Sequence, residues 1–324
     1  MAHAVKHSTE VAPQIHLIQV PIPYPFKYVN CYLLKGEGAV LVDCALDTPE
    51  ARPGLEAALA EHGLSFADLD QVVLTHHHPD HYGLCGLIEA YGPKVGMLDL
   101  EKERGHIFWT QDQRMMREGM ALFARHGVTG EVLQGLEEEM RATRQRVHPA
   151  QNPQTFHDGE TLQLAGMSFR VIWTPGHADG HAMFLRESDG VLLAGDQILE
   201  RISPNIGIWA YSFPNPLALY LESLEKTARL GAKVAFTGHY GPIQDIPGRC
   251  RELAQHHQER LAHLRGLMGG EAKTAWALSL ELFPGNLNLA QRRFAWSETL
   301  AHLEYLVAEG SAQRLEGQPV RYTL

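Results

Sequence analysis

The sequence predicts an α+β fold, and three observations carry that prediction. Short apolar runs of strand length recur between residues 15 and 239, and several of them end at a glycine followed by His or Asp. Residues 101–147 instead read as long polar helices, which indicates a helical insertion. After residue 247 the composition shifts to further helices and a short hairpin. With 324 residues, the chain is long enough for a catalytic domain over 1–247 and a second domain over 248–324.

The amino-terminal part predicts a sheet with one covering helix. Residues 15–20 and 30–34 are apolar strands, separated by a proline-rich linker that favours a sheet edge or a turn. Residues 39–43 form a third buried strand that ends in the carboxylate of Asp43. Residues 49–62 have the apolar spacing of an amphipathic helix.

The densest group of chemically active side chains follows the next strand. An apolar run ends at Thr75, and His76, His78, Asp80 and His81 come directly after it. Pro79 keeps the preceding residue extended and suits the first turn of a helix, which we expect to continue over 82–91. Three imidazoles and a carboxylate this close together are unfavourable unless a cation accepts their lone pairs. A histidine-rich surface turn without metal is the alternative.

Three later strand ends carry further side chains of the same kind. The strand over 169–174 leads to His177, the strand over 191–194 leads to Asp196, and the strand over 234–237 leads to His239. A glycine precedes each of these residues, which allows a sharp turn and a close approach of the backbone to a metal. One such coincidence would mean little, but three of them after the histidine cluster indicate a single metal site.

At these residues the sequence resembles the metallo-β-lactamase-fold hydrolases, from about the amino terminus to residue 245. The resemblance implies an αββα sandwich with the metals at one edge of two sheets. It further implies one metal on His76, His78 and His177, and a second on Asp80, His81 and His239, with Asp196 bridging both. Asp196 stands where many true β-lactamases have a cysteine ligand. This difference makes antibiotic hydrolysis an unfavoured activity and favours the glyoxalase II type.

Two divalent cations in such a site would generate hydroxide between them at neutral pH, and this bridging hydroxide would attack a polarised carbonyl or phosphorus. Asp80 is the expected catalytic residue, because it can also orient the nucleophile or shuttle a proton. Zinc suits the imidazole-rich set, and manganese or iron suits the second position, which is richer in carboxylate. We expect Asp43 to accept a hydrogen bond from a ligating imidazole, with a helix cap near Thr48 as the alternative. His181 is left out of the ligand set as a structural neighbour.

Aromatic residues near the ligands are candidates for substrate contact. Trp209 and Tyr211 follow Asp196 in an aromatic loop, and core packing is an equal alternative for both. In relatives the early hairpin lies near the metal cleft, so Tyr24, Phe26 and Tyr28 either touch substrate or form a hydrophobic clasp.

The carboxy-terminal region predicts helices over 249–268, 272–283 and 289–309, then a hairpin over 312–322. This order resembles a winged helix, which some proteins of the metallo-β-lactamase fold carry, including an endoribonuclease subgroup. Acidic residues interrupt its arginines, so no basic stripe for duplex DNA is present, and a packing or dimerising role is favoured. His256, His257 and Arg260 predict a solvated helical face rather than a third metal site.

Composition limits the remaining functions. The formal charge of -10 argues against non-specific binding to nucleic acid or to an anionic membrane. The four cysteines are scattered, and no apolar run is long enough to span a bilayer, so the cytoplasm is the expected location. The leading hypothesis is hydrolysis of a small ester, thioester or lactone. Cleavage of single-stranded RNA or of a nucleotide phosphodiester is the second, and a non-catalytic, metal-stabilised scaffold is the third.

Overall fold

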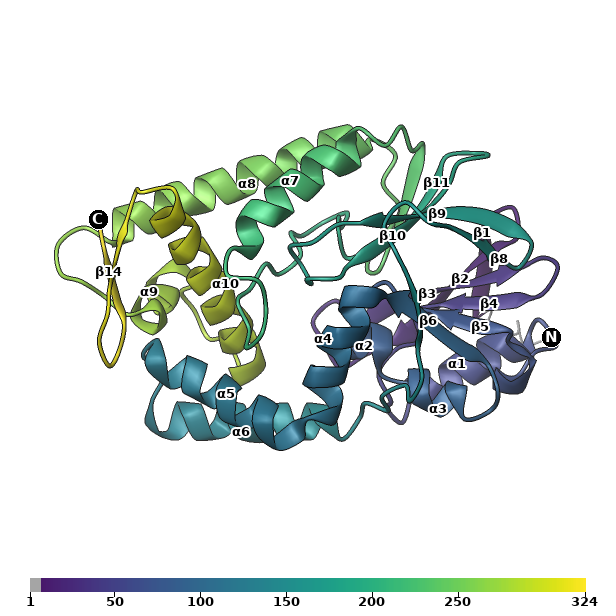
Figure 1. The fold of residues 1–324 in the computed structure, drawn as a ribbon, viewed down its shortest axis with the longest axis horizontal. Helices are drawn as coiled ribbons and strands as arrows, with labels where there is room; N and C mark the ends of the chain where they lie inside the picture. Colours follow the sequence, from purple (N-terminus) through teal and green to yellow (C-terminus); the bar gives the residue numbers. More distant parts are fainter. Residues whose placement is uncertain (1–6) are drawn as a thin grey trace.

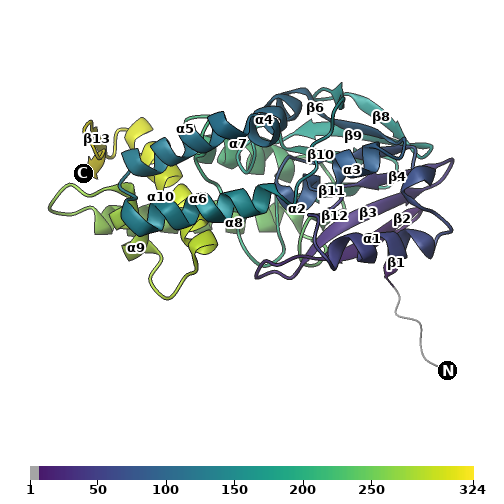
Figure 2. The same cartoon turned by 90° about the horizontal axis from the view of Figure 1, so that it is seen from below.

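The computed structural model describes residues 7–324, except the side chain of residue 112. Figure 1 shows the two large sheets at one end of the molecule and most of the long helices at the other. Figure 2, turned by 90°, shows the same separation.

The first sheet has seven strands in chain order, antiparallel from β1 to β4 and parallel from β4 to β7. Its strands are β1 (Ser8–Ala12), β2 (Ile15–Pro21), β3 (Tyr28–Lys35), β4 (Ala39–Val42), β5 (Gln71–Val73), β6 (Lys94–Leu98) and β7 (Gln154–Phe156). The sequence does not mark β1 and β7 as strands, because both are short and lack a continuous apolar run.

The second sheet has five strands in the order β12-β11-β10-β9-β8, and only β11 and β12 are parallel to each other. Its strands are β8 (Thr161–Leu164), β9 (Met167–Trp173), β10 (Ala182–Arg186), β11 (Val191–Gly195) and β12 (Val234–Thr237).

Alternation along the strands builds the layers. In β10, Ala182 and Phe184 belong to the core between the two sheets, whereas Met183 and Leu185 belong to the core under the outer helices. The helices α1 (Ala51–Ala60) and α3 (Cys85–Glu89) cover the outer face of the first sheet. The helices α7 (Pro216–Ala228) and α8 (Ile246–Leu267) cover the second sheet. This arrangement confirms the predicted αββα sandwich.

The remaining elements form the helical end of the molecule. They are α4 (Asp99–Thr110), α5 (Asp112–Arg125), α6 (Gly130–Arg144), α9 (Ala275–Leu282), α10 (Leu289–Ala308), β13 (Gln313–Leu315) and β14 (Arg321–Thr323). The ring centroids of Phe123 on α5 and Trp296 on α10 are 4.4 Å apart. Leu136 and Met140 of α6 belong to the same buried cluster as Trp296, so the inserted helices and the carboxy-terminal helices share one core.

Two predictions are corrected here. The helix expected over 82–91 is broken into α2 (Pro79–Tyr82) and α3, because the Leu84 amide donates to the Ala45 carbonyl at 3.0 Å instead of to a carbonyl of the preceding helical turn. The solvated face expected around His257 is wrong for that residue. His257 is fully buried, and its Nδ1 lies 3.1 Å from Nε2 of His302 on α10.

Two other observations concern the whole described chain. All four cysteines are buried and none forms a disulfide. Within residues 7–324 we find no helix with the length and apolarity needed to cross a bilayer.

Candidate metal centre

The seven predicted ligand side chains lie together at one edge of the sandwich. His76 and His78 occupy the loop after β5, and Asp80 and His81 lie in α2. His177, Asp196 and His239 follow β9, β11 and β12 of the second sheet. The structure therefore brings together residues that are far apart in the chain, and three groups of them have ligand atoms within 4.8 Å of one another.

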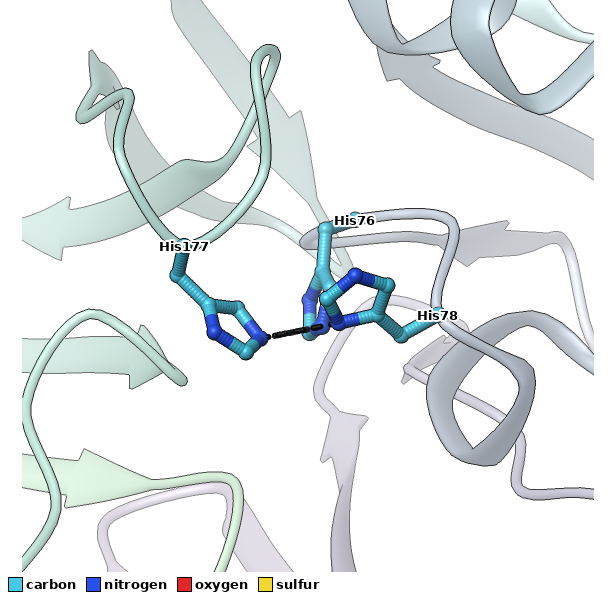
Figure 3. Close-up of side chains that lie close together, drawn as sticks. All are labelled: His76, His78 and His177. Atoms are coloured by element: carbon cyan, nitrogen blue, oxygen red, sulfur yellow. Dashed lines mark hydrogen bonds between the residues drawn. The ribbon is translucent and has the colours of Figure 1, made fainter. Parts of the chain in front are cut away.

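One group consists of three histidines (Figure 3). Nδ1 of His78 is 2.9 Å from Nε2 of His177, which is 3.3 Å from Nε2 of His76. His76 is fully buried, and His78 is the partly exposed member. The group therefore faces solvent on the side of His78.

A second group combines the carboxylate of Asp80 with two histidines. Oδ2 of Asp80 lies 3.3 Å from Nε2 of His239 and 4.0 Å from Nε2 of His81. Asp196 lies between the two groups: its Oδ1 is 3.5 Å from His81, and its Oδ2 is 3.6 Å from His177. Asp196 is thus within reach of both groups.

The other ring nitrogen of each ligand fixes how the imidazole is oriented. Nδ1 of His177 donates to the Asn205 carbonyl at 2.9 Å, and Nδ1 of His239 donates to the Tyr28 carbonyl at 2.8 Å. A ring that donates through Nδ1 keeps the lone pair of Nε2 for another partner. In both rings that lone pair points into the cluster.

Asp43 serves two of the ligands at once. Its Oδ2 accepts a hydrogen bond from Nδ1 of His81 at 2.8 Å and another from the Thr75 hydroxyl at 2.9 Å. The Thr75 oxygen in turn lies 2.9 Å from Nδ1 of His76. The contact with His81 is the one expected of Asp43. The alternative role as a helix cap falls to Thr48, whose hydroxyl accepts from the amide of Ala51 at 3.0 Å.

Glu101 is a buried carboxylate whose role cannot be predicted from the sequence. It lies on α4 and accepts hydrogen bonds from the His77 amide at 2.6 Å and from the Gly180 amide at 2.8 Å, and its Oε1 also contacts Nδ1 of His77. Glu101 therefore joins the loop of His76 and His78 to the loop of His177. No local pattern marks it, because it stands in an ordinary charged helix start.

Two glycines allow the close packing around Asp196. A Cβ on Gly238 would lie 2.2 Å from Oδ1 of Asp196. Gly195 has a φ of +49°, and a Cβ there would lie 2.7 Å from Nε2 of His181. Nε2 of His181 itself accepts a hydrogen bond from the Asp196 amide at 3.1 Å, so its lone pair already has a partner within the protein.

The charges of the cluster are strongly coupled. Burial lowers the pKa of His76, His78 and His177, which keeps these rings neutral. Burial alone would raise the pKa of Asp196, but the neighbouring His239 and His81 hold it well below its usual range. Burial opposes protonation of His239, yet Asp196 and Asp80 raise its pKa to about 9.

These residues have the chemistry of a site for divalent metal. Nε2 of His81, Nε2 of His239 and Oδ1 of Asp196 are buried and have no hydrogen-bond partner within the described chain. Buried polar atoms are rarely left in this state, and imidazole and carboxylate are the donors that zinc and related metals take. The donor set and its unpaired atoms thus agree with a metal centre.

Aromatic side chains border the cluster. The ring centroids of Phe26 and His239 are 4.2 Å apart, and those of Tyr24 and Phe26 are 5.7 Å apart. The ring centroids of Trp209 and of Phe294 on α10 are 6.0 Å apart. Cζ of Arg114, on α5, lies 4.9 Å from the ring centroid of Tyr211. Of the candidates for substrate contact, Phe26 is thus beside a ligand, whereas Trp209 and Tyr211 contact the helical end of the molecule.

Comparison with known proteins identifies the class. The model of the metallo-beta-lactamase superfamily matches residues 24–239, and that of the metallo-beta-lactamase-like C-terminal domain matches residues 261–324. The chain belongs to the metallo-beta-lactamase superfamily, and with this donor set it is a metal-dependent hydrolase.

Three relatives resemble it over most of their length. A metallo-beta-lactamase family protein from Thermus thermophilus is 51% identical, with a TM-score of 0.89 and coverage of 97% of this chain and 99% of that one. A beta-lactamase domain protein from Burkholderia ambifaria is 29% identical, with a TM-score of 0.86 and coverage of 99% and 96%. A probable metallo-hydrolase from Bacillus subtilis is 29% identical over 90% of this chain and 92% of its own.

Proposed function

We propose that the protein is a dinuclear metallohydrolase that cleaves a small ester, thioester or lactone. The observation that carries this proposal is the position of Asp196, whose two carboxylate oxygens lie 3.5 Å from His81 and 3.6 Å from His177, one ligand from each group. A carboxylate in this place can serve two cations, with His76, His78 and His177 on one and Asp80, His81 and His239 on the other. Zinc is the metal that the imidazole-rich set favours, and manganese or iron also suits the second position.

When bound, the two cations supply a Lewis acid and a water of lowered pKa. The residues of the chain orient the imidazoles, transfer the proton and limit the access of water. Asp43 and the Asn205 and Tyr28 carbonyls orient the imidazoles. Asp80, held against His239, has its second oxygen available to take a proton from the attacking water and to return it to the leaving group. Phe26 reduces access of bulk water on the side of His239.

The test compares wild type with an Asp80→Asn variant on a panel of esters, thioesters and lactones after metal content has been measured. We expect wild type to hydrolyse at least one class, and Asp80→Asn to lose about 100-fold or more of kcat because proton transfer and metal binding both suffer. Activity in the variant equal to wild type would reveal a contaminating enzyme. A metal-loaded wild type that cleaves nothing on the panel would refute the proposal.

RNA cleavage is the less favoured alternative. Arg314, at the hairpin, lies 3.2 Å from Glu304 and 2.6 Å from Glu316, and Arg125 lies 3.2 Å from Glu316. These cations are already partnered by carboxylates, so the hairpin offers little for phosphate groups. A small molecule is therefore the proposed substrate.

A further inference from the structure

Arg293 on α10 is a cation at the border of the metal centre. The carbonyl of the next residue, Phe294, accepts a hydrogen bond from the Asn205 side chain at 3.2 Å. The Asn205 carbonyl in turn accepts the Nδ1 hydrogen of His177. Arg293 thus lies one residue from a short chain of hydrogen bonds that ends at a metal ligand.

The surroundings of Arg293 hold its guanidinium in place. The group lies 5.4 Å from the ring of Trp209 and 4.9 Å from the ring of Phe294, which are nearly perpendicular to each other. Its Nε is 3.1 Å from Oε2 of Glu139 on α6, and the side chain is only 13% exposed. The position of the planar group is therefore set from three sides.

Most of the hydrogen-bonding capacity of this guanidinium is unused. Arginine has five N–H donors. Nε of Arg293 faces Glu139 without forming a hydrogen bond, and we find no hydrogen bond from either Nη atom to any residue in 7–324. A largely buried cation with free donors is unfavourable unless solvent or a ligand satisfies them. A guanidinium that is held in place, with both Nη atoms free of hydrogen bonds to the described chain, can bind a carboxylate through two parallel N–H groups.

Tyr24 is a second polar side chain at the border of the metal centre. Its ring packs against Phe26, which packs against the ligand His239, and its hydroxyl makes no hydrogen bond to any residue that the structure describes. Burial raises the pKa of Tyr24, the carboxylate of Asp80 raises it further, and Arg293 lowers it. Tyr24 therefore borders the metal centre through Phe26.

We propose that Arg293 binds a carboxylate of the substrate, so that the preferred substrate is an ester or thioester bearing a second, anionic group. Trp209 acts in this subsite by holding the guanidinium, and Glu139 limits its strength by partial neutralisation. The inference rests on the hydrolase activity proposed above and specifies its substrate class.

The test uses matched substrates that differ only in a carboxylate. One pair is the mono-para-nitrophenyl ester of glutarate and para-nitrophenyl valerate, which vary the acyl side. The other pair is the butyryl thioesters of mercaptopropionate and mercaptopropanol, which vary the leaving group. For one of the two pairs we expect wild type to prefer the anionic member, and this pair shows on which side of the scissile bond the carboxylate lies.

Arg293→Gln should lower kcat/KM for the preferred anionic substrate about 10-fold or more, chiefly through KM, because a charge-assisted bond is lost. It should change the neutral partner by less than about 2-fold. Glu139→Gln should act in the opposite direction by freeing the guanidinium, and Arg293→Lys should retain part of the preference. Arg229→Gln is the control, since Arg229 is 78% exposed at the end of α7 and pairs with Glu225.

Equal losses on both members of a pair would mean that Arg293 has only a structural role, and no preference in wild type would overturn the subsite. If Arg293→Gln does not fold, the opposite effect of Glu139→Gln still decides. Calorimetric binding of glutarate to metal-loaded wild type and to Arg293→Gln separates the two proposals. Binding that Arg293→Gln abolishes, without hydrolysis of any ester, would retain the subsite and reject the hydrolase. Equal binding to both proteins would reject the subsite.

Discussion

At the scale of single residues, one carboxylate organises much of the metal centre. Asp43 has a φ of +60°, a left-handed conformation that is unfavourable for a residue with a Cβ. In this conformation its side chain reaches both His81 and Thr75, and through Thr75 also His76. The hydrogen bonds that Asp43 accepts therefore offset a local backbone cost.

We expect Asp43→Asn to weaken metal binding by about 10- to 100-fold, because the amide loses the charge that orients His81 and makes it more basic. Metal retained after titration with a chelator is the measurement. Asp158→Asn is the matched control, since Asp158 is 46% exposed and pairs with Lys226. Unchanged metal affinity in Asp43→Asn would show that the contact only supports the fold.

The sequence allows the ligands to be predicted but not all of their supports. His177, Asp196 and His239 each follow an apolar strand and a glycine, and this local pattern can be recognised in the sequence alone. Asp43 can be inferred because it also ends a strand. Glu101 and Arg293 have no such mark, since their roles depend on how α4 and α10 dock against loops distant in sequence. Predicting them requires the tertiary arrangement.

At the scale of elements, α4 connects two ligand loops through one buried side chain. Both carboxylate oxygens of Glu101 accept backbone hydrogen bonds, one from each loop. The indole of Trp109, on the same helix, donates to the His77 carbonyl at 2.8 Å. The first inserted helix thus determines the spacing between the two loops.

Glu101→Gln should reduce both metal affinity and kcat, because the new NH₂ group meets an N–H donor instead of accepting from it. A mismatch of this kind costs about 1–3 kcal/mol. Metal titration and steady-state kinetics measure the effect. Glu103→Gln, on the same helix and 64% exposed, should behave as wild type. A Glu101→Gln protein with normal metal affinity and kcat would exclude the connection as a functional one.

The packing of α8 against α10 depends on two buried histidines. Burial lowers the pKa of His257 to about 2 and that of His302 to about 3, and the nearby Arg260 and His256 act in the same direction. In the unfolded chain a histidine has a pKa of about 6.5. Below that pH the unfolded state binds more protons, so this contribution to stability is lost as the pH falls from about 6.5 toward 3.

We therefore expect the free energy of unfolding to fall between pH 7 and pH 4.5, and to fall less in a His257→Phe, His302→Leu double variant. Urea unfolding at several pH values measures both slopes. Altered packing also changes the free energy of unfolding of the double variant at every pH. The comparison therefore uses only the slope of the free energy of unfolding against pH. Identical slopes would show that these two rings titrate normally.

At the scale of the whole molecule, a single buried core continues through residue 247, the boundary predicted between two domains. Leu217 and Leu224 of α7, Leu253 of α8 and Trp296 of α10 belong to one cluster, together with residues of α5 and α6. The separate carboxy-terminal match over 261–324 thus corresponds to a region packed onto the rest of the chain. The winged-helix likeness of this region stays a prediction.

Removal of metal should destabilise the whole molecule, since the ligands come from both sheets and their lone pairs face one another. A ligand present at about 100 times its Kd adds about 2.7 kcal/mol to the stability of the folded state. We expect a chelator to lower Tm by at least about 5 °C and added zinc to restore it. If metal analysis confirms that the metal has been removed and the melting curve is unchanged, a structural role for the metal is contradicted.

The link from His177 through Asn205 to α10 also has a consequence for biosynthesis. All seven ligands leave the ribosome before Phe294, whose carbonyl holds the Asn205 side chain. In a nascent chain all seven ligand side chains are therefore synthesised before the hydrogen bond between the Asn205 side chain and the Phe294 carbonyl can form. Translation order therefore places the synthesis of every candidate ligand before that of the residue that anchors the Asn205 side chain.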